Sequence, residues 1–241
     1  WESADKLHWT CINTLTTPEP FGFMWECPDL FELDGRWFLA VSPQGIECQN
    51  VYGCGYFPVY GDWRGACTLG EFRHADFGFD YYAPQSFADG GRRVQIGWMG
   101  MPDADYTNPV DFGWQHCLTV PRQLTRDGDR LLQNPVAELA ALRGAAHDLP
   151  DGETVDLLAA PAGDFTLTVA DGVQLAYCEA ERSCTLYFTN AAMAYGRTSR
   201  HVVLNAPCRR LRVVGDASSL EVFLNDGAAV LSTRYYPAPG P

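Results

Sequence analysis

Short apolar or alternating segments recur along this chain, and turn-forming Gly, Pro, Asp and Asn separate them. The clearest are RWFLAVS (36–42), NVYGCGYFPV (50–59), RRVQIGWMG (92–100) and HCLTVPRQLT (116–125). In the third segment Val94, Ile96 and Trp98 alternate with polar or small residues, which is the period-2 pattern of a half-buried strand. Strands at this spacing predict an all-β fold, either a sandwich, a barrel or a propeller.

One helix is expected to interrupt the strands. In QNPVAELAALRG, Asn134 can cap a helix, Pro135 suits its first turn and Gly144 can end it. The stretch 145–164 that follows is rich in Ala, Gly, Pro and Asp, as in a boundary between domains. We therefore expect a first β unit over 1–130, a linker helix within 131–145 and a second β unit over 146–241.

The second unit contains two predicted hairpins. The segments FTLTVADGVQLAY (165–177) and LEVFLNDGAAVLSTRYY (220–236) each hold two runs around Asp-Gly, which supplies the positive φ of a tight turn. A two-sheet sandwich is the natural arrangement for such strands. Alternation places Glu221 opposite Leu220 and Val222, so we expect Glu221 to face solvent.

Composition excludes some partners. Hydrophobic residues make up 46% of the 241 residues, which indicates a packed protein, and the net charge is −13. An acidic chain repels phosphate backbones, so no nucleic-acid partner is expected. No apolar run approaches the roughly 20 residues that a membrane helix needs, so no membrane partner is expected either.

The nine cysteines are irregularly spaced and form no C-x-x-C pair. Because a zinc site needs clustered ligands, we expect no metal and no other cofactor. A disulfide framework also fits the spacing poorly. The cysteines are better explained as buried free thiols in a reducing cytoplasm, which predicts a cytoplasmic protein.

The stretch FGFMWECPDLF (21–31) surrounds one carboxylate, Glu26, with apolar and aromatic residues. Two interpretations are open. Glu26 is either an ordinary surface residue of a strand or an acid whose apolar surroundings favour the protonated form, which could act as a general acid.

Seven motifs, in their order as well as their content, resemble glycoside hydrolase family 32, the family of invertases, fructan hydrolases and bacterial sucrose-6-phosphate hydrolases. They are WECPDLF, SPQGI, DFGFDYYAPQSF, RRVQIGWMG, GWQHCLTVPRQL, QNPVAEL and SSLEVFLNDG. The resemblance implies a five-bladed β-propeller that carries the active site, followed by a C-terminal β-sandwich. Residues 1–130 would then be the C-terminal part of an incomplete propeller.

The resemblance also implies a reaction, the retaining hydrolysis of terminal β-D-fructofuranosides. In such a mechanism one carboxylate attacks the anomeric carbon, while a second carboxyl about 5 Å away protonates the leaving oxygen. The Glu-Cys motif of the family supplies the second group. It falls on Glu26, with Cys27 supporting the site. The pair Glu47-Cys48 lacks the following Pro-Asp and is expected to be a structural loop.

Other motif residues are candidates for the sugar site. Asp80, Tyr82 and Gln85 could hydrogen-bond fructose hydroxyls. The alternative is that Asp80 closes a turn while the aromatic residues fill the propeller core. Trp98 matches a position whose ring lines the sugar pocket in the family, and core packing is its alternative.

The nucleophile motif of the family is missing. Neither a Trp-Met-Asn-Asp-Pro-Asn-Gly type motif nor an Arg-Asp-Pro motif occurs in this sequence. About half of the propeller is therefore expected to come from the parent chain. We expect the 241 residues alone to be catalytically silent and prone to associate through uncovered strand edges.

Within the family, SPQGI, GYFPV and DFGFDYYAPQSF look closest to the intracellular bacterial sucrose-6-phosphate hydrolases. The expected partner is a small sugar: sucrose, sucrose 6-phosphate or a fructan. An exo-acting fructan hydrolase and a non-catalytic fructan-binding protein are the alternatives. Arg64 and Arg73 are the nearby cations, and both are expected to be surface ion-pair partners.

Overall fold

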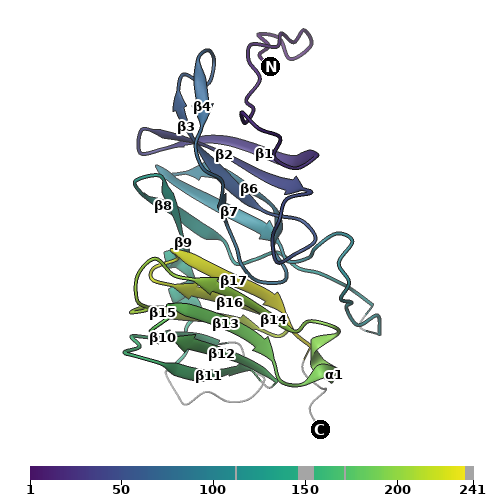
Figure 1. Cartoon of the computed structure of the whole chain (residues 1–241), viewed down its shortest axis with the longest axis vertical. Helices are drawn as coiled ribbons and strands as arrows, with labels where there is room; N and C mark the ends of the chain where they lie inside the picture. Colours follow the sequence, from purple (N-terminus) through teal and green to yellow (C-terminus); the bar gives the residue numbers. More distant parts are fainter. Residues whose placement is uncertain (112, 146–154, 171, 237–241) are drawn as a thin grey trace.

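A computed structural model describes residues 1–111, 113–145, 155–170 and 172–236. Its strands form antiparallel sheets, two in the N-terminal part and two in the C-terminal part (Figure 1). The predicted all-β class is confirmed.

The first sheet has the order β1-β2-β3-β4, and a short fifth strand pairs with β3. Its members are β1 (Met24–Leu33), β2 (Arg36–Gln44), β3 (Gly55–Gly61), β4 (Cys67–Leu69) and β5 (Arg73–His74). Asp34 and Gly35 join β1 to β2 with φ angles of 47° and 75°. Positive φ at both turn residues matches the right-handed twist of the two strands, so this Asp-Gly pair sets the register of the hairpin.

The second sheet has the order β6-β7-β8-β9. Its members are β6 (Tyr82–Asp89), β7 (Arg92–Trp98), β8 (Arg122–Asp127) and β9 (Arg130–Pro135). The prediction that β7 is half-buried by strict alternation is wrong, because Gln95 is only 3% exposed and accepts a 2.9 Å hydrogen bond from the Tyr81 hydroxyl. Successive residues Val94 and Gln95 are both buried, so both faces of β7 are covered at this point.

Apolar side chains pack the two N-terminal sheets against each other. Phe31, Phe38 and Tyr56 of the first sheet form one buried cluster with Leu124 and Leu131 of the second. These two sheets correspond to two of the five blades that the family resemblance implies.

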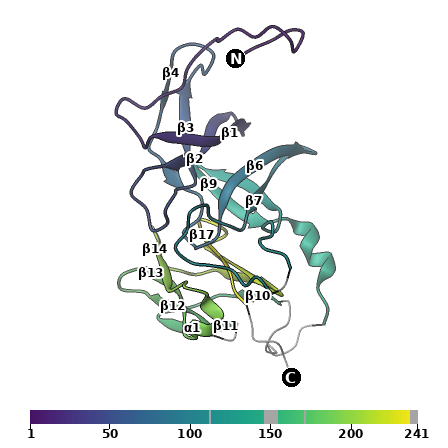
Figure 2. The same ribbon diagram turned by 90° about the vertical axis from the view of Figure 1, so that its right-hand side faces the viewer.

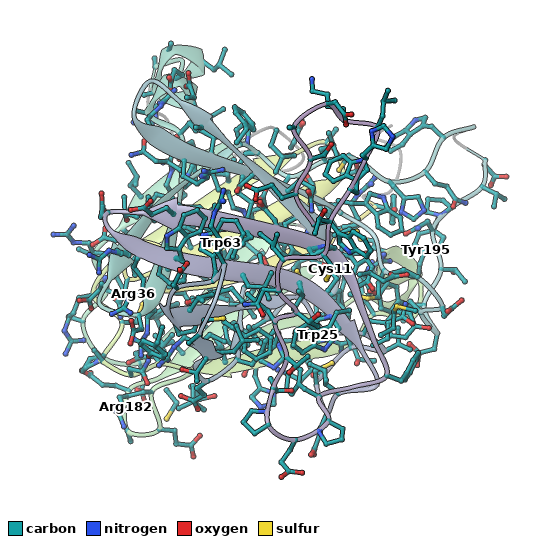
Figure 3. All side chains as sticks on the ribbon, turned by 90° about the horizontal axis from the view of Figure 1, so that it is seen from above. Cys11, Trp25, Arg36, Trp63, Arg182 and Tyr195 are labelled. Carbon is teal, nitrogen blue, oxygen red and sulfur yellow. The ribbon has the colours of Figure 1, made fainter. Side chains whose placement is uncertain are left out.

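The opposite face of the first sheet is covered by the N-terminal segment. There the Trp25 ring stacks on Phe57 with centroids 5.2 Å apart, and Phe21 packs beside both. Figure 3 looks onto this sheet from the end away from the C-terminal sheets and labels Trp25.

The linker helix differs from the prediction. Asn134 and Pro135 belong to β9, where they pair with Gln123 and Arg122, and only Ala137–Leu142 form a helix, η1, of the 3-10 type. The Asn134 side chain donates to the Asp226 carbonyl and caps nothing. The strand ladder and this contact outweigh the local helix signal. Figure 2 shows η1 as a short coil at the side of the molecule.

The C-terminal part is the predicted β-sandwich. One sheet has the order β10-β15-β16-β17, with β10 (Val155–Ala159), β15 (Leu211–Asp216), β16 (Ser219–Leu224) and β17 (Ala229–Arg234). The other has the order β11-β12-β13-β14, with β11 (Phe165–Ala170), β12 (Val173–Cys178), β13 (Ser183–Phe188) and β14 (Ser199–Val203). A short helix, α1 (Ala191–Ala194), follows β13. Residues 146–154 of the predicted second unit lie outside the described residues.

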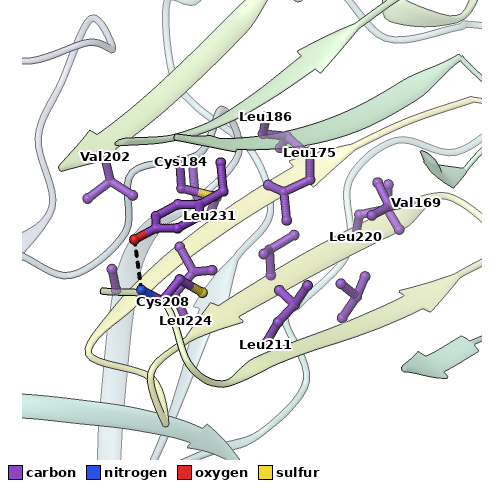
Figure 4. Packing of buried hydrophobic residues seen from close by; sticks show 14 of the residues in the cluster. Val169, Leu175, Cys184, Leu186, Val202, Cys208, Leu211, Leu220, Leu224 and Leu231 are labelled. Atoms are coloured by element: carbon purple, nitrogen blue, oxygen red, sulfur yellow. Dashed lines mark hydrogen bonds between the residues drawn. The ribbon is translucent and has the colours of Figure 1, made fainter. Parts of the chain in front are cut away.

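Leucine, valine and cysteine side chains from both sheets fill the sandwich core (Figure 4). The Cys208 amide donates a 2.9 Å hydrogen bond to the Tyr177 hydroxyl, so the one polar atom of that ring has a partner. Both predicted hairpins are confirmed, β11-β12 and β16-β17.

All nine cysteines are free thiols. Cys54, Cys184 and Cys208 are buried, whereas Cys11 and Cys27 are exposed and the remaining four are half-buried. The interpretation as buried thiols therefore holds for a third of them. No helix in the described ranges is long and apolar enough to cross a membrane.

Candidate active site

Glu26 lies immediately before a β-bulge in β1. Glu26 pairs with Ser42 and Asp29 with Ala40, so Cys27 and Pro28 together oppose a single residue of β2. Cys27 takes a left-handed φ of 50°. Pro28 suits this place because it has no N–H to donate to the ladder. A bulge re-aims the neighbouring side chains, here the Glu26 carboxyl.

A second bulge of the same form lies in β6. Tyr82 pairs with Trp98 and Gln85 with Ile96, so Ala83 and Pro84 oppose one residue of β7. Ala83 has a φ of 48°. Glu-Cys-Pro-Asp and Tyr-Ala-Pro-Gln therefore form the same type of bulge, each in the first strand of its sheet.

The two bulges face each other across the gap between the sheets. The Tyr82 hydroxyl donates a 2.8 Å hydrogen bond to Oε2 of Glu26, and the Ala83 amide donates to the Ser42 hydroxyl at 3.2 Å. Tyr82 is only 2% exposed, whereas Glu26 is half-buried. Burial, and then the bond to Glu26, raises the pKa of the Tyr82 phenol, so it remains a donor across the physiological range.

A second phenol and carboxylate pair adjoins the first. The Tyr52 hydroxyl donates to Oδ2 of Asp103 at 2.7 Å, and the Tyr52 ring centroid lies 6.1 Å from that of Tyr82. The bond to Asp103 is the main cause that raises the pKa of Tyr52. Sequence reasoning missed Tyr52 and Asp103. The sequence feature that could have indicated Asp103 is its position in the loop after β7, since functional residues often lie in loops that follow strands.

The predicted residues Cys27 and Gln85 support the bulges. The Gln85 amide donates to the backbone carbonyls of Cys27 and Pro84, each at 3.0 Å. Partial burial and the neighbouring Glu26 charge raise the pKa of the exposed Cys27 thiol. The amide nitrogen of Gln85 is therefore engaged with backbone, while the side chain is exposed, and a sugar contact by Gln85 stays a prediction.

Asp80 is buried and its carboxylate is occupied by other residues of the chain, which contradicts its predicted sugar contact. It is 1% exposed, and its carboxylate accepts two bonds of 2.9 Å from the Arg197 guanidinium and one of 2.8 Å from the Arg234 amide. A charge this deeply buried needs such partners. Its role is to join the second sheet to the sandwich.

The whole segment 76–80 runs along β17. The Phe77 amide donates to the Val230 carbonyl at 2.8 Å and the Asp80 amide to the Ser232 carbonyl at 3.1 Å. At Gly78 a Cβ atom would lie 2.0 Å from the Ser232 carbonyl oxygen, so only glycine fits there. Half of the motif DFGFDYYAPQSF thus docks the sandwich, while the other half forms the second bulge.

A buried ion triad lies beside this segment. The fully buried Arg122 guanidinium donates to Glu221 at 2.6 Å and to Asp76 at 3.2 Å. The Val120 amide donates to the other Glu221 oxygen at 2.7 Å. The prediction that Glu221 faces solvent is wrong, because it is 2% exposed. Contacts from the propeller sheets cover the strand face on which it lies.

Trp98 is half-buried and is the register partner of Tyr82. Its ring packs against His116 with centroids 4.9 Å apart. At Gly100 a Cβ atom would lie 2.4 Å from the Trp98 ring and 2.7 Å from the His116 ring, so the glycine permits this packing. A sugar contact by Trp98 stays a prediction.

The remaining candidates have the predicted structural character. Glu47 and Cys48 lie in the loop after β2, beside a hollow of about 320 Å³ that is also lined by Tyr52 and His74. Glu26 does not line that hollow. β1 and β6 are edge strands of their sheets, and the half-buried Glu26 of β1 meets Tyr82 of β6 where these two edges adjoin.

The predicted surface cations are also paired. Arg64 contacts Glu2 at 2.7 Å and Arg73 contacts Glu71 at 3.6 Å, so the ion pairs expected of both arginines are confirmed.

Comparison with known sequences identifies relatives over nearly the whole chain. The sucrose-6-phosphate hydrolase of Bacillus subtilis is 38% identical over 99% of this chain and 56% of its own length. That of Staphylococcus xylosus is 33% identical over 98% and 54%. The chain therefore spans about half the length of these relatives.

Solved structures agree. The sucrose-6-phosphate hydrolase from Lactobacillus gasseri superposes with a TM-score of 0.76 at 26% identity, over 90% of this chain and 51% of that one. A Bombyx mori GH32 beta-fructofuranosidase gives 0.76 at 26% identity, over 97% and 54%. Two family models match in succession, the glycosyl hydrolases family 32 N-terminal domain at residues 1–135 and the glycosyl hydrolases family 32 C terminal at residues 158–241. The chain belongs to glycosyl hydrolase family 32.

Proposed function

We propose that this chain carries the acid/base part of the active site of an enzyme that hydrolyses terminal β-D-fructofuranosides with retention. The observation that carries the proposal is the Glu26 carboxyl at a bulge, bonded at 2.8 Å to a buried phenol of the neighbouring sheet. Relatives named as sucrose-6-phosphate hydrolases and β-fructofuranosidases support the reaction class.

In the proposed reaction Glu26 acts twice. It first protonates the leaving glycosidic oxygen, and it then takes a proton from the water that releases the sugar. Because Tyr82 binds Oε2, the other carboxyl oxygen is left to face the substrate. The attacking carboxylate belongs to a motif that this sequence does not contain, and the proposal takes it from the rest of the parent protein.

Sucrose 6-phosphate is the proposed substrate, since the most similar relatives reported above carry that name. An exo-acting fructan hydrolase is the alternative within the class, and a non-catalytic fructan-binding protein is the alternative outside it. Rates of the full-length protein on sucrose 6-phosphate, sucrose and inulin separate the first two. Binding of inulin without release of fructose would favour the third.

The decisive variant is Glu26→Gln in the full-length gene product. Loss of a general acid/base should lower kcat about 10²- to 10⁴-fold. Glu47→Gln is a matched control, because Glu47 also precedes a cysteine but lies in an exposed loop. Equal losses in the two variants, or full activity of Glu26→Gln, would contradict the assignment. The 241-residue chain alone should show no turnover above background.

A further inference from the structure

We propose that Asp29 and Gln85 are positioning residues of this site, which tie the two bulges together and so hold the Glu26 carboxyl against the Tyr82 phenol. The inference rests on the proposed function above. It assigns a role to two side chains whose hydrogen bonds go to neither the Glu26 carboxyl nor the Tyr82 hydroxyl.

The first tie starts at Asp29, the residue at which regular pairing of β1 resumes. Its Oδ2 accepts bonds from the Ser86 amide at 2.9 Å and from the Ser86 hydroxyl at 2.6 Å. Ser86 is the second residue after the bulge of β6, and Arg93 donates to its hydroxyl at 3.4 Å. One carboxylate thus fixes the position of β6 relative to β1.

The second tie runs in the opposite direction. The Gln85 amide donates to the Cys27 carbonyl at 3.0 Å, and Cys27 is the left-handed residue of the first bulge. Asp29 of β1 therefore bonds to the backbone of β6, and Gln85 of β6 bonds to the backbone of β1. Asp29 follows Glu26 by three residues, and Gln85 follows Tyr82 by three.

No backbone ladder performs this task. β1 and β6 belong to separate sheets, so hydrogen bonds between strands do not set their relative register. The left-handed conformation of Cys27 is one that non-glycine residues adopt only when their surroundings enforce it. Without the ties, the bulge can relax and the Glu26 carboxyl can move. A displacement of about 1 Å at a reacting group can cost about 10²-fold in rate.

If Asp29 and Gln85 only stabilise the fold, their loss should slow every substrate equally. If they position the acid, their loss should slow mainly a substrate that needs acid catalysis. Sucrose needs a proton on its leaving oxygen, whereas β-D-fructofuranosyl fluoride releases fluoride with little help from an acid. Misplacement of the acid should therefore lower kcat/KM for sucrose far more than kcat/KM for the fluoride, whereas loss of folded protein lowers both equally. The ratio kcat/KM reports formation of the glycosyl-enzyme, so the later step, in which Glu26 acts as a base on water with either substrate, does not enter the comparison.

The test uses the full-length protein with Asp29→Ala and, separately, Gln85→Ala. For each we expect kcat/KM on sucrose to fall about 10- to 100-fold and kcat/KM on the fluoride to change by less than about threefold. Asp29→Asn should recover part of the rate, because an amide oxygen can still accept from Ser86. Gln85 is exposed, so its truncation keeps the test open if Asp29→Ala does not fold.

Asp129→Ala is the matched control. Asp129 accepts a 2.7 Å bond from the Tyr60 hydroxyl and so also joins the two N-terminal sheets, but far from the bulges in sequence and pairing. It should not change the ratio of the two rates. An unchanged ratio in both Asp29→Ala and Gln85→Ala overturns the inference. If the wild type cleaves neither of these substrates nor sucrose 6-phosphate, the proposed function fails; if Glu26→Gln alone changes the ratio, only this inference fails.

Discussion

Asp80 and Arg197 are separated by 117 residues and form a two-point ion pair. Asp80 precedes the second propeller sheet, and Arg197 precedes β14 of the sandwich. Both side chains are almost fully buried, so both charged groups are desolvated. The two parts of the chain are therefore joined by charge as well as by apolar contact.

Removing one partner of this pair should be costly. Asp80→Asn leaves the Arg197 charge buried without a counter-ion, and such a change lowers the free energy of unfolding by about 3–5 kcal/mol. Urea unfolding of the chain, followed by tryptophan fluorescence, measures the difference. Asp226→Asn, which breaks the exposed pair with Arg210, should have little effect, and an equal loss in both variants would contradict this account.

Gly78→Ala tests the docking of the segment 76–80 on β17. The added methyl group would lie 2.0 Å from the Ser232 carbonyl oxygen, so the segment must move away from the strand. We expect a loss of about 1–3 kcal/mol or more in the free energy of unfolding. Gly144→Ala is the control, because a Cβ there meets no atom within 4 Å. Equal unfolding midpoints for the two variants would show that the contact is not tight.

Tyr82→Phe removes the hydroxyl that donates to Glu26 but keeps the ring. A hydrogen bond to a charged group contributes about 1.5–3 kcal/mol, so kcat of the full-length protein on sucrose should fall roughly 10- to 100-fold. The KM should change little if the bond orients the acid rather than the sugar. A rise in KM at constant kcat would instead place the phenol in substrate binding.

His74 predicts a pH dependence of stability. Burial lowers the pKa of His74 below its ordinary value of 6.5, so the unfolded chain binds this proton at a higher pH than the folded chain does. The free energy of unfolding should therefore fall as pH drops below about 6.5, by at most about 1.4 kcal/mol per pH unit for one proton, and level off below the folded pKa.

His74→Gln should remove that slope, whereas His201→Gln, at an exposed position of β14, should keep it. Urea unfolding between about pH 5 and 7.5 measures the difference between each variant and the parent, which cancels the contribution of the carboxylates. Parallel curves for His74→Gln and the parent would exclude the buried histidine as the cause.

Cys27 reports the Glu26 charge without an activity assay. Partial burial is the larger cause of its raised thiol pKa, and the Glu26 carboxylate adds to it. Since the thiolate is the nucleophile, Glu26→Gln should speed alkylation of Cys27 by iodoacetamide near pH 8. Alkylation of the exposed Cys11 is the internal reference, identified by peptide mass. An unchanged Cys27 rate would show that the two side chains are not electrostatically coupled.

The sequence predicted the fold class because its strands carry strong local signals. The Asp-Gly turns and alternating runs of the sandwich are local features, and β11-β12 and β16-β17 form as expected. The helix signal at Asn134 and Pro135 was also local, but it competed with a ladder to β8 and with a side-chain bond to Asp226. Long-range pairing decided that segment, and no pattern within it shows its partners.

The site was predicted in part for the same reason. The motif around Glu26 is contiguous, and the structure adds the bulge that its Cys-Pro pair produces. Asp80 and Glu221 were misassigned because their partners, Arg197 and Arg122, are about 100 residues or more away in sequence. Alternation cannot show that a second domain covers a strand face. Tyr52 and Asp103 come together only through folding.

Segment 76–80, which docks on β17, ends two residues before Tyr82 and the bulge of β6, and this limits how the protein can be divided. Tyr82 follows Asp80 by two positions. The residues that hydrogen-bond to β17 therefore also determine the position of the Tyr82 backbone. A cloning boundary between residues 135 and 158 would separate the two matched family domains. It would also break the hydrogen bonds between segment 76–80 and β17. Chimaeras that exchange the C-terminal module must carry β17 with a matching 76–80 stretch, or Tyr82 and its hydrogen bond to Glu26 will shift without any substitution near them.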